Sequence, residues 1–297
     1  MIDGAMTVWF GLTGACLVLL TIDLVRNSPV SWVQKLGWWL VVLYTGPVGF
    51  IAFLYACRRP FPGGHDEFTR PVWKQGINSE VHCLAGDATG ILVAASLAAS
   101  LALPAGWELI LEYAAGFLSG LFIFQALMMI RMYDGNYLLA VRRTVFAETV
   151  SMNFVMIGML PTMVVLSELW PESREPSQAA FWFRISLGSI AGGITAFPVN
   201  RWLVARHLKH GCMTLPGADT PVHASHRSPE SPHHMHGGGH EGHEGMHGGH
   251  DMHGGGHEGH QAGSISRAES IAWVVGSTIL LIAVLAVVAN FHPISFR

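Results

Sequence analysis

The sequence predicts an all-α integral membrane protein: a helical bundle of about seven transmembrane helices with a disordered, His-rich cytoplasmic loop. Three observations predict this fold class. Hydrophobic residues make up 51% of the 297-residue chain and charged residues only 12%, about half the charged share of a soluble domain. Apolar stretches of roughly 20 residues, the length that crosses a bilayer, recur along the chain. One long polar segment, residues 205–268, is rich in Gly, His, Pro and Ser.

The apolar stretches divide the chain into three parts. Residues 1–204 are expected to form a six-helix membrane bundle, residues 205–268 a disordered metal-binding loop, and residues 269–297 a seventh helix with a short tail. Gly116 and Gly120 form a GxxxG pair, which is typical of closely packed membrane helices. The expected spans are 5–25, 36–57, 81–103, 107–131, 149–168, 180–204 and 269–290.

The distribution of Lys and Arg predicts the orientation. With seven spans, twelve of these residues fall on the side of the N-terminus and the His-rich loop, and five fall on the other side. Cytoplasmic loops carry the excess of Lys and Arg, so both features are expected on the cytoplasmic face of an inner (plasma) membrane. The net charge of −3 argues against a nucleic-acid partner. The expected partners are the lipid bilayer and transition-metal ions, with a homo-oligomer or a partner membrane protein left open.

The polar loop contains a tract of metal ligands. Residues 235–260 hold eight histidines, three methionines and four acids among eleven glycines, and the nonapeptide MHGGGHEGH occurs in them twice. Imidazole is a borderline ligand for copper, zinc and nickel, and such a glycine-rich string cannot bury a core. We expect a movable metal-binding arm, and the alternative is a solvated spacer. The candidate ligands are His236, His240, His243, His247, His250, His253, His257 and His260.

Four methionines follow one face of the fifth expected span. Met152, Met156, Met159 and Met163 fall within an arc of about 60° on a helix. Thioethers prefer Cu(I) to Zn(II) or Ni(II), so this methionine stripe predicts a Cu(I) path in the bundle. The alternative is that these methionines are adaptable packing residues.

The third expected span opens with further candidate ligands, His82, Cys83 and Asp87. A carboxylate two turns into the membrane is costly unless it is paired or functional. These residues therefore predict a metal or proton site, and Asp87 and Glu148 are candidate proton-coupling groups. The alternative is that Asp87 caps a partner helix or pairs with an Arg. Other potential ligands are expected at the same end of the bundle: Cys57, Met128, Met129, Met132, His207, His210, Cys212 and Met213.

Three stretches carry a family resemblance. The segment FPVNRWLVARHLKHGCMT, residues 197–214, resembles the ending of an uncharacterised bacterial membrane-protein family, a catalogued domain of unknown function. The HCLAGD of residues 82–87 and the Met-rich fifth span are similar to earlier blocks of that family. The resemblance covers about residues 75–215, and it implies a shared membrane module without bringing an established activity.

Three functions are consistent with these features. The favoured one is a transition-metal membrane transport or transfer protein, in which the arm collects copper and the Met, Cys, His and Asp residues of the bundle pass it inward. The second is a membrane-bound metalloenzyme or metallocofactor assembly factor, although the sequence has no HExxH and no paired ExxH motif. The third is a metal buffer or sensor that the bundle anchors. The expected cofactor is copper, as Cu(I) in the bundle, with zinc or nickel as alternatives at the arm.

Overall fold

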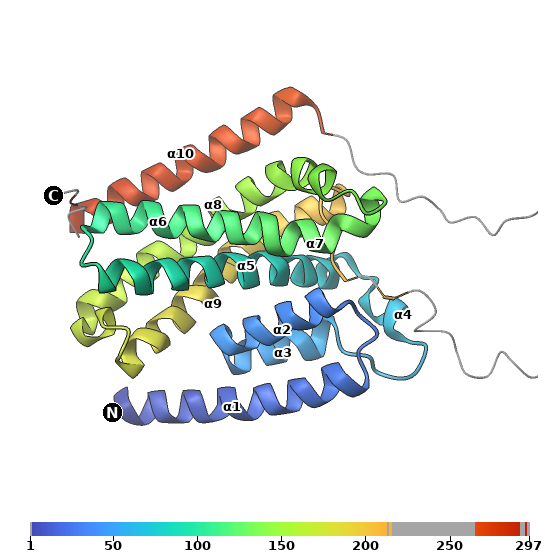
Figure 1. The fold of residues 1–297 in the computed structure, drawn as a ribbon, viewed down its shortest axis with the longest axis horizontal. Coiled ribbons are helices and arrows are strands. Elements are labelled where there is room, and N and C mark those ends of the chain that lie inside the picture. The colour runs from blue at the N-terminus through green and yellow to red at the C-terminus, as the bar shows by residue number, and fades with distance from the viewer. Residues whose placement is uncertain (1, 213, 216–264, 292–294, 296–297) are drawn as a thin grey trace, which may run out of the picture.

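The computed structural model describes residues 2–212, 214–215, 265–291 and 295. The described part is helical and contains no β-strand beyond one isolated bridge, which confirms the all-α membrane bundle (Figure 1). Six of its helices are long and apolar enough to cross a membrane. They are α1 (Ile2–Arg26), α5 (Val72–Ser100), α6 (Ala105–Leu118) with its continuation to Met129, α8 (Tyr137–Leu169), α9 (Ala179–Ala205) and α10 (Arg267–Phe291).

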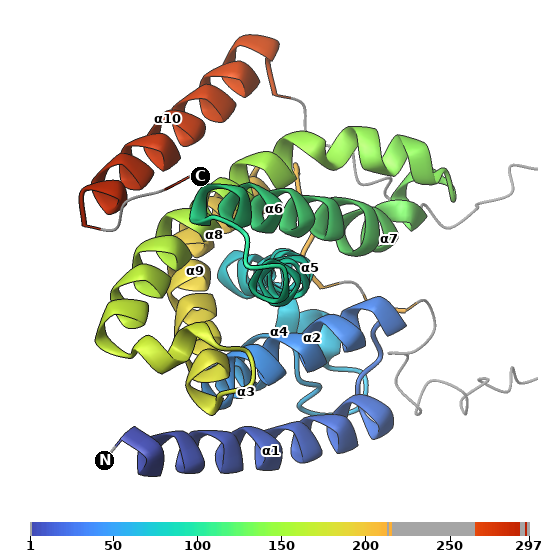
Figure 2. The ribbon, with the colours of Figure 1, turned by 60° about the vertical axis from the view of Figure 1, so that its left-hand side comes forward.

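Helix α5 is the centre of the bundle. In its most apolar stretch 72% of the residues are buried, against 17% for α1 and 11% for α10. Figure 2 looks almost along α5 and shows the other long helices arranged around it. Helices α1 and α10 instead expose large apolar side chains over much of their length, as helices that face lipid do. The inward-facing residues of α5 are therefore in position to form an internal site.

The segment expected as the second span is a helical hairpin instead. Helix α2 (Trp32–Thr45) and helix α3 (Pro47–Ala56) are joined at Gly46, which has a φ of 57°. A Cβ at Gly46 would collide with the side chain of Thr13 on α1, so this turn requires glycine both for its backbone and for its packing. Neither helix reaches the roughly 20 residues that a span needs.

Both ends of the hairpin lie at the same end of the bundle. Val30, just before α2, forms the isolated bridge with Thr214. Cys57, just after α3, lies against Cys212, with 3.6 Å between the two sulfurs. The prediction of a membrane span over residues 36–57 is therefore wrong, because hydropathy averaged along a segment does not register a reversal of direction.

The hairpin also changes the end of the bundle at which the N-terminus lies. Trp9, early in α1, packs against Phe183 near the start of α9, with ring centroids 5.8 Å apart. The other end of α1 leads to Val30 beside Thr214. The N-terminus therefore lies at the opposite end of the bundle from the chain that precedes the His-rich arm (Figure 1). The expectation that the N-terminus and the arm share one side is wrong for the same reason as the second span.

The predicted GxxxG pair packs as expected, and it adjoins an unusual turn. A Cβ at Gly86 of α5 would lie 2.5 Å from the Cα of Gly120, and one at Gly116 would meet Ile91. Gly120 lies in a π-helical stretch that follows α6 directly.

Helix α8 begins well before the expected residue 149. The remaining elements are α4 (His65–Thr69), the π-helix η1 (Ser119–Gln125), α7 (Ala126–Met129), and the 3₁₀ turns η2 (Ile130–Tyr133) and η3 (Pro171–Arg174).

Candidate metal centre

The short segment Lys209–Cys212, which follows α9, inserts into the end of the bundle. Gly211 in its middle lies directly on α5, where a Cβ would collide with Gln75. Glycine therefore allows the backbone to approach α5 closely. Lys209, His210 and Cys212, on either side of Gly211, each belong to a different part of the candidate site: a polar cluster, a small cavity and a triad of metal-ligand residues.

The first group is a buried triad of metal-ligand residues, Cys57, His65 and Cys212. Their ligand atoms all lie within 4.8 Å of one another. The two sulfurs are 3.6 Å apart, and the Cys212 sulfur is 3.8 Å from His65 Nε2. Two thiols and an imidazole are a donor set suited to copper or zinc. The hairpin and α4 bring the first two residues to the third, so the triad depends on the fold.

His65 is held by hydrogen bonds on both ring nitrogens. Its Nδ1 lies 2.7 Å from the Thr214 hydroxyl, and its Nε2 lies 3.1 Å from the carbonyl oxygen of Cys57. A carbonyl oxygen can only accept, so Nε2 carries a hydrogen in this structure; a metal ion would have to displace that proton, which leaves Nδ1–H donating to Thr214 and the Nε2 lone pair facing the two sulfurs. This is the arrangement in which a hydrogen bond on one nitrogen orients a metal-binding histidine.

The Cys212 thiol is the less acidic member of the sulfur pair. Its hydrogen bond with Cys57 and its burial both raise the pKa of Cys212 well above its usual range. A metal ion binds thiolate rather than thiol, so binding at this site would release the Cys212 proton.

The second group is a polar cluster inside the bundle, consisting of Glu80, Cys83, Asp87, Glu148, Asn200 and Lys209. At its centre the Lys209 ammonium contacts the Cys83 sulfur and lies 3.8 Å from Glu148 Oε2. The Cys83 thiol donates to the same Glu148 oxygen at 3.3 Å. Burial lowers the pKa of Lys209, but the interactions of Lys209 with Cys83 and Glu148 outweigh this effect and leave the pKa above its usual value. Lys209 therefore stays protonated.

Asn200 links Glu80, another acid of the cluster, to Lys209 by hydrogen bonds. Its amide nitrogen donates to Glu80 Oε2 and, at 2.8 Å, to the Ser151 hydroxyl. Its amide oxygen accepts from Lys209 at 2.8 Å. One lysine thus stands among three buried acids, so the cluster carries an excess of carboxylates.

Asp87 and Glu148 meet over Gly120 in the π-helical turn. A Cβ at Gly120 would collide with Oδ1 of Asp87 and Oε1 of Glu148. These two oxygens and Oδ2 of Asp87 are buried without a conventional donor among the described residues, and the two carboxyl groups can share a hydrogen bond only when one of them is protonated. Carboxylates in such a place are stable only when a proton or another cation neutralises them. π-Helical turns are frequent at functional sites.

The third group is a small cavity beside the triad. It has a volume of about 10 Å³ and is lined by His82, Gln125, Met128, Met129, His210 and Gly211. His82 therefore faces a different part of the molecule from its neighbour Cys83, which lies in the polar cluster. The structure does not bring His82, Cys83 and Asp87 together as one ligand set.

The methionine stripe lies on the far side of the polar cluster from the triad. Met152, Met156 and Met159 are buried in an apolar cluster with Ile91 and Leu160, which is the environment expected of packing residues. Their part in metal transfer stays a prediction. The eight histidines of the arm lie outside the described residues.

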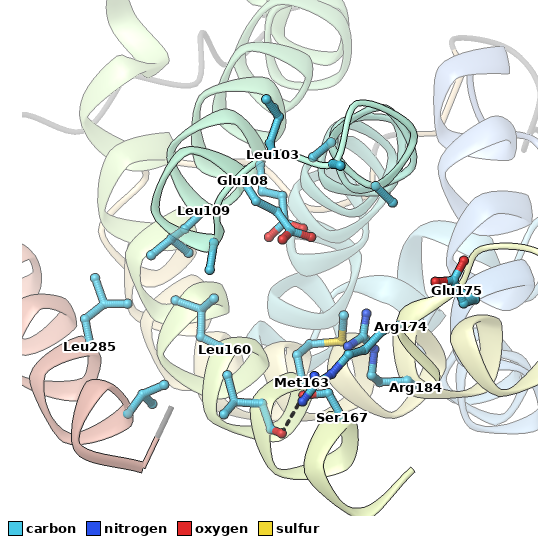
Figure 3. Close-up of a pocket in the computed structure, with 17 residues that line it drawn as sticks. Leu103, Glu108, Leu109, Leu160, Met163, Ser167, Arg174, Glu175, Arg184 and Leu285 are labelled. Atoms are coloured by element: carbon cyan, nitrogen blue, oxygen red, sulfur yellow. Dashed lines mark hydrogen bonds between the residues drawn. The ribbon is translucent and has the colours of Figure 1, made fainter. Parts of the chain in front are cut away.

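The stripe leads to a cavity at the opposite end of the bundle from the triad. A Cβ at Gly116 would meet both the Met152 side chain and the backbone oxygen of Asp87, so the stripe begins beside the polar cluster. It ends at Met163, which lines a cavity of about 290 Å³. Figure 3 shows Glu108 on one wall of this outer cavity, with Arg174 and Arg184 on the opposite wall near Met163.

Sequence reasoning placed Cys57 and Cys212 at one end of the bundle but missed His65 and Lys209 as site residues. His65 lies in a loop, FPGGHDEF, that carries no periodic pattern. By sequence Lys209 resembles an ordinary loop charge, but the loop folds back into the bundle and buries Lys209 to 1% exposure. The available signal was the spacing of Lys, His and Cys within LKHGC.

The comparison with protein families assigns the central part of the chain. Residues 72–209 match the family described as a domain of unknown function, DUF4396. The matched segment covers slightly less than half of the chain. It holds α5 to α9 and every residue of the polar cluster, whereas the triad residues lie outside it on both sides. No curated protein and no solved structure matches the chain. The polar cluster therefore lies within the segment that matches this family, and the triad is formed by the chain around that segment.

Proposed function

We propose that this protein transports or transfers transition-metal ions, copper foremost, between the His-rich arm and the membrane bundle. The observation that carries the proposal is the buried triad of Cys57, His65 and Cys212, whose ligand atoms lie within 4.8 Å of one another. Cys212 lies close in sequence to the start of the His-rich segment. An ion that the arm collects would therefore meet a soft, enclosed donor set at the adjoining end of the bundle.

The groups beyond the triad offer a route inward. The polar cluster supplies carboxylates and the Cys83 thiol, the methionine stripe supplies thioethers, and the outer cavity opens at Met163. Several sites of moderate affinity in series let an ion pass without being trapped at one of them. Asp87 and Glu148 are then candidates for the proton-coupling groups.

The arm end of the bundle would face the cytoplasm. Positive residues gather at this end, where Arg26, Lys35, Arg58, Arg59, Arg70, Lys74, Arg201, Arg206 and Arg267 lie at or near helix ends. The opposite end carries Arg174 and Arg184. This asymmetry follows the positive-inside rule and supports an inner-membrane protein whose arm is cytoplasmic.

Flux measurements on the reconstituted full-length protein test the proposal. Vesicles would be loaded with an indicator, and uptake of Cu(I), Zn(II) and Ni(II) compared. We expect Cu(I) flux, with at least a tenfold loss in the Cys57→Ser and Cys212→Ser variants because each removes a thiolate ligand. Met156→Leu with Met159→Leu tests the stripe, since this exchange keeps apolar volume but removes the thioethers.

Cys16→Ser is the matched control, because Cys16 is a half-buried thiol on α1 that is not one of the triad's ligand residues. Its flux should equal that of the unaltered protein. Absence of flux for all three ions would overturn the proposal. A tightly held metal without flux would instead fit a metalloenzyme or an anchored metal buffer.

A further inference from the structure

The small cavity lined by His82 adjoins two buried acceptor atoms that have no hydrogen-bond partner among the described residues. They are His82 Nδ1 and Gln125 Oε1, on side chains that are 3% and 2% exposed. A buried acceptor that receives no hydrogen bond costs about 1–3 kcal/mol. Two of them at one cavity point to something that the cavity holds.

The hydrogen bond of His82 fixes which nitrogen has the lone pair. His82 Nε2 lies 3.4 Å from the carbonyl oxygen of Gly211. A carbonyl oxygen can only accept, so Nε2 carries the hydrogen and Nδ1 of the neutral ring carries the lone pair. A backbone carbonyl that binds one ring N–H is the usual support of a metal-binding histidine.

The other cavity walls supply soft ligands. Met128 and Met129 come from α7, and Met129 is 4% exposed. The Met128 sulfur also accepts a weak hydrogen bond from the Ser31 hydroxyl at 3.7 Å. His210 lines the same cavity, next to Gly211. One imidazole nitrogen and two thioethers form a neutral donor set, which favours Cu(I) over harder divalent ions.

The cavity also adjoins the triad. The segment that places Cys212 in the triad places His210 at the cavity and the Gly211 carbonyl on His82. Gly211, which lines the cavity, and Cys212, which belongs to the triad, are consecutive residues, so an ion would pass directly from one site to the other. The volume of about 10 Å³ is that of one water-sized particle.

We infer that His82, Met128 and Met129 form a second Cu(I)-binding site, a transfer site next to the triad. The inference rests on the proposed metal-transfer function for its role, but not for the binding itself. The rival occupant is one buried water that donates to His82 Nδ1 and Gln125 Oε1. A metal ion bound to the thioethers would shift the methyl resonances of Met128 and Met129 on titration, whereas a water would leave them unmoved.

The test uses the full-length protein with ¹³C-labelled methionine methyl groups. Ag(I), a stand-in for Cu(I), and then Cu(I) under reducing conditions would be titrated in chloride-free buffer. We expect the methyl resonances of Met128 and Met129, assigned with the Met128→Leu and Met129→Leu variants, to shift on binding. His82→Gln keeps a donor for Gly211 but removes the imidazole ligand, and it should weaken the binding that these methyl groups report by about tenfold or more.

His207→Gln is the matched control, because His207, a potential ligand by sequence, is exposed and belongs to neither the small cavity nor the triad. It should leave the methyl shifts unchanged. If His82→Gln unfolds the protein, Met129→Leu alone should still weaken binding at Met128. Unmoved Met128 and Met129 methyl groups at saturating ion, or shifts that His82→Gln does not alter, would overturn the second site. The methyl shifts do not depend on flux, so this failure is distinct from failure of the transport proposal.

Discussion

Gly120 is the residue at which the packing of the polar cluster is most sensitive. It leaves room for the carboxylates of Asp87 and Glu148, which a Cβ would strike. We expect Gly120→Ala to destabilise the protein by about 1–3 kcal/mol, because overpacking displaces buried side chains. Denaturant unfolding in detergent measures this change.

The matched control is Gly11→Ala in α1, where a Cβ would meet nothing within 4 Å. It should be neutral or stabilising by up to about 1 kcal/mol, since alanine is the better helix former. Equal stability of the Gly120→Ala and unaltered proteins would contradict the close approach of the two carboxylates.

Individual residues show how far the sequence could predict the site. Asp87 stood out because a carboxylate within a membrane helix is costly, and the structure places it in the polar cluster. Lys209 did not stand out, because a lysine beyond the end of a span resembles an ordinary loop charge. The partners of both residues come from α5, α8 and the segment after α9, so their meeting depends on tertiary packing that no local pattern encodes.

Among the elements, the α2–α3 hairpin departs most from the sequence prediction. Residues 36–57 are apolar throughout, and a hydropathy average treats them as one span. The available signal was the Gly46–Pro47 pair, since Gly-Pro marks turns. The expected spans 107–131 and 180–204 lie close to the helices found there, because neither segment contains a reversal of direction and hydropathy then suffices.

Cysteine labelling tests the hairpin. We expect Asn27→Cys before α2 and Arg58→Cys after α3, both at exposed positions, to react with a membrane-impermeant maleimide from the same side of sealed vesicles. The physical reason is that α2 and α3 return to one end of the bundle. Glu172→Cys in η3, also exposed, should react from the other side, and the unaltered protein gives the background. Labelling of Asn27→Cys and Arg58→Cys from opposite sides would restore the span predicted from sequence.

For the whole molecule, the all-α membrane class follows from composition alone, whereas the topology does not. Counting one span too many places the N-terminus beside the arm, and the Lys and Arg count then assigns both to the cytoplasm. With the hairpin, α1 crosses once and the arm end keeps nearly all the positive residues. The charge bias becomes stronger, which is what the positive-inside rule leads one to expect of a correct topology.

Fusion reporters test this topology in cells. An N-terminal alkaline phosphatase, which is active only outside the cytoplasm, should be active, because an odd number of crossings separates the N-terminus from the arm. A C-terminal phosphatase should also be active, since Ser295 accepts a hydrogen bond from Gly106 N at 2.7 Å and α6 begins at the end away from the arm. A fluorescent protein that matures only in the cytoplasm, inserted in the arm, should fluoresce. The N-terminal fusion decides between the two topologies, because seven spans would leave it inactive while predicting the same result at the other two positions.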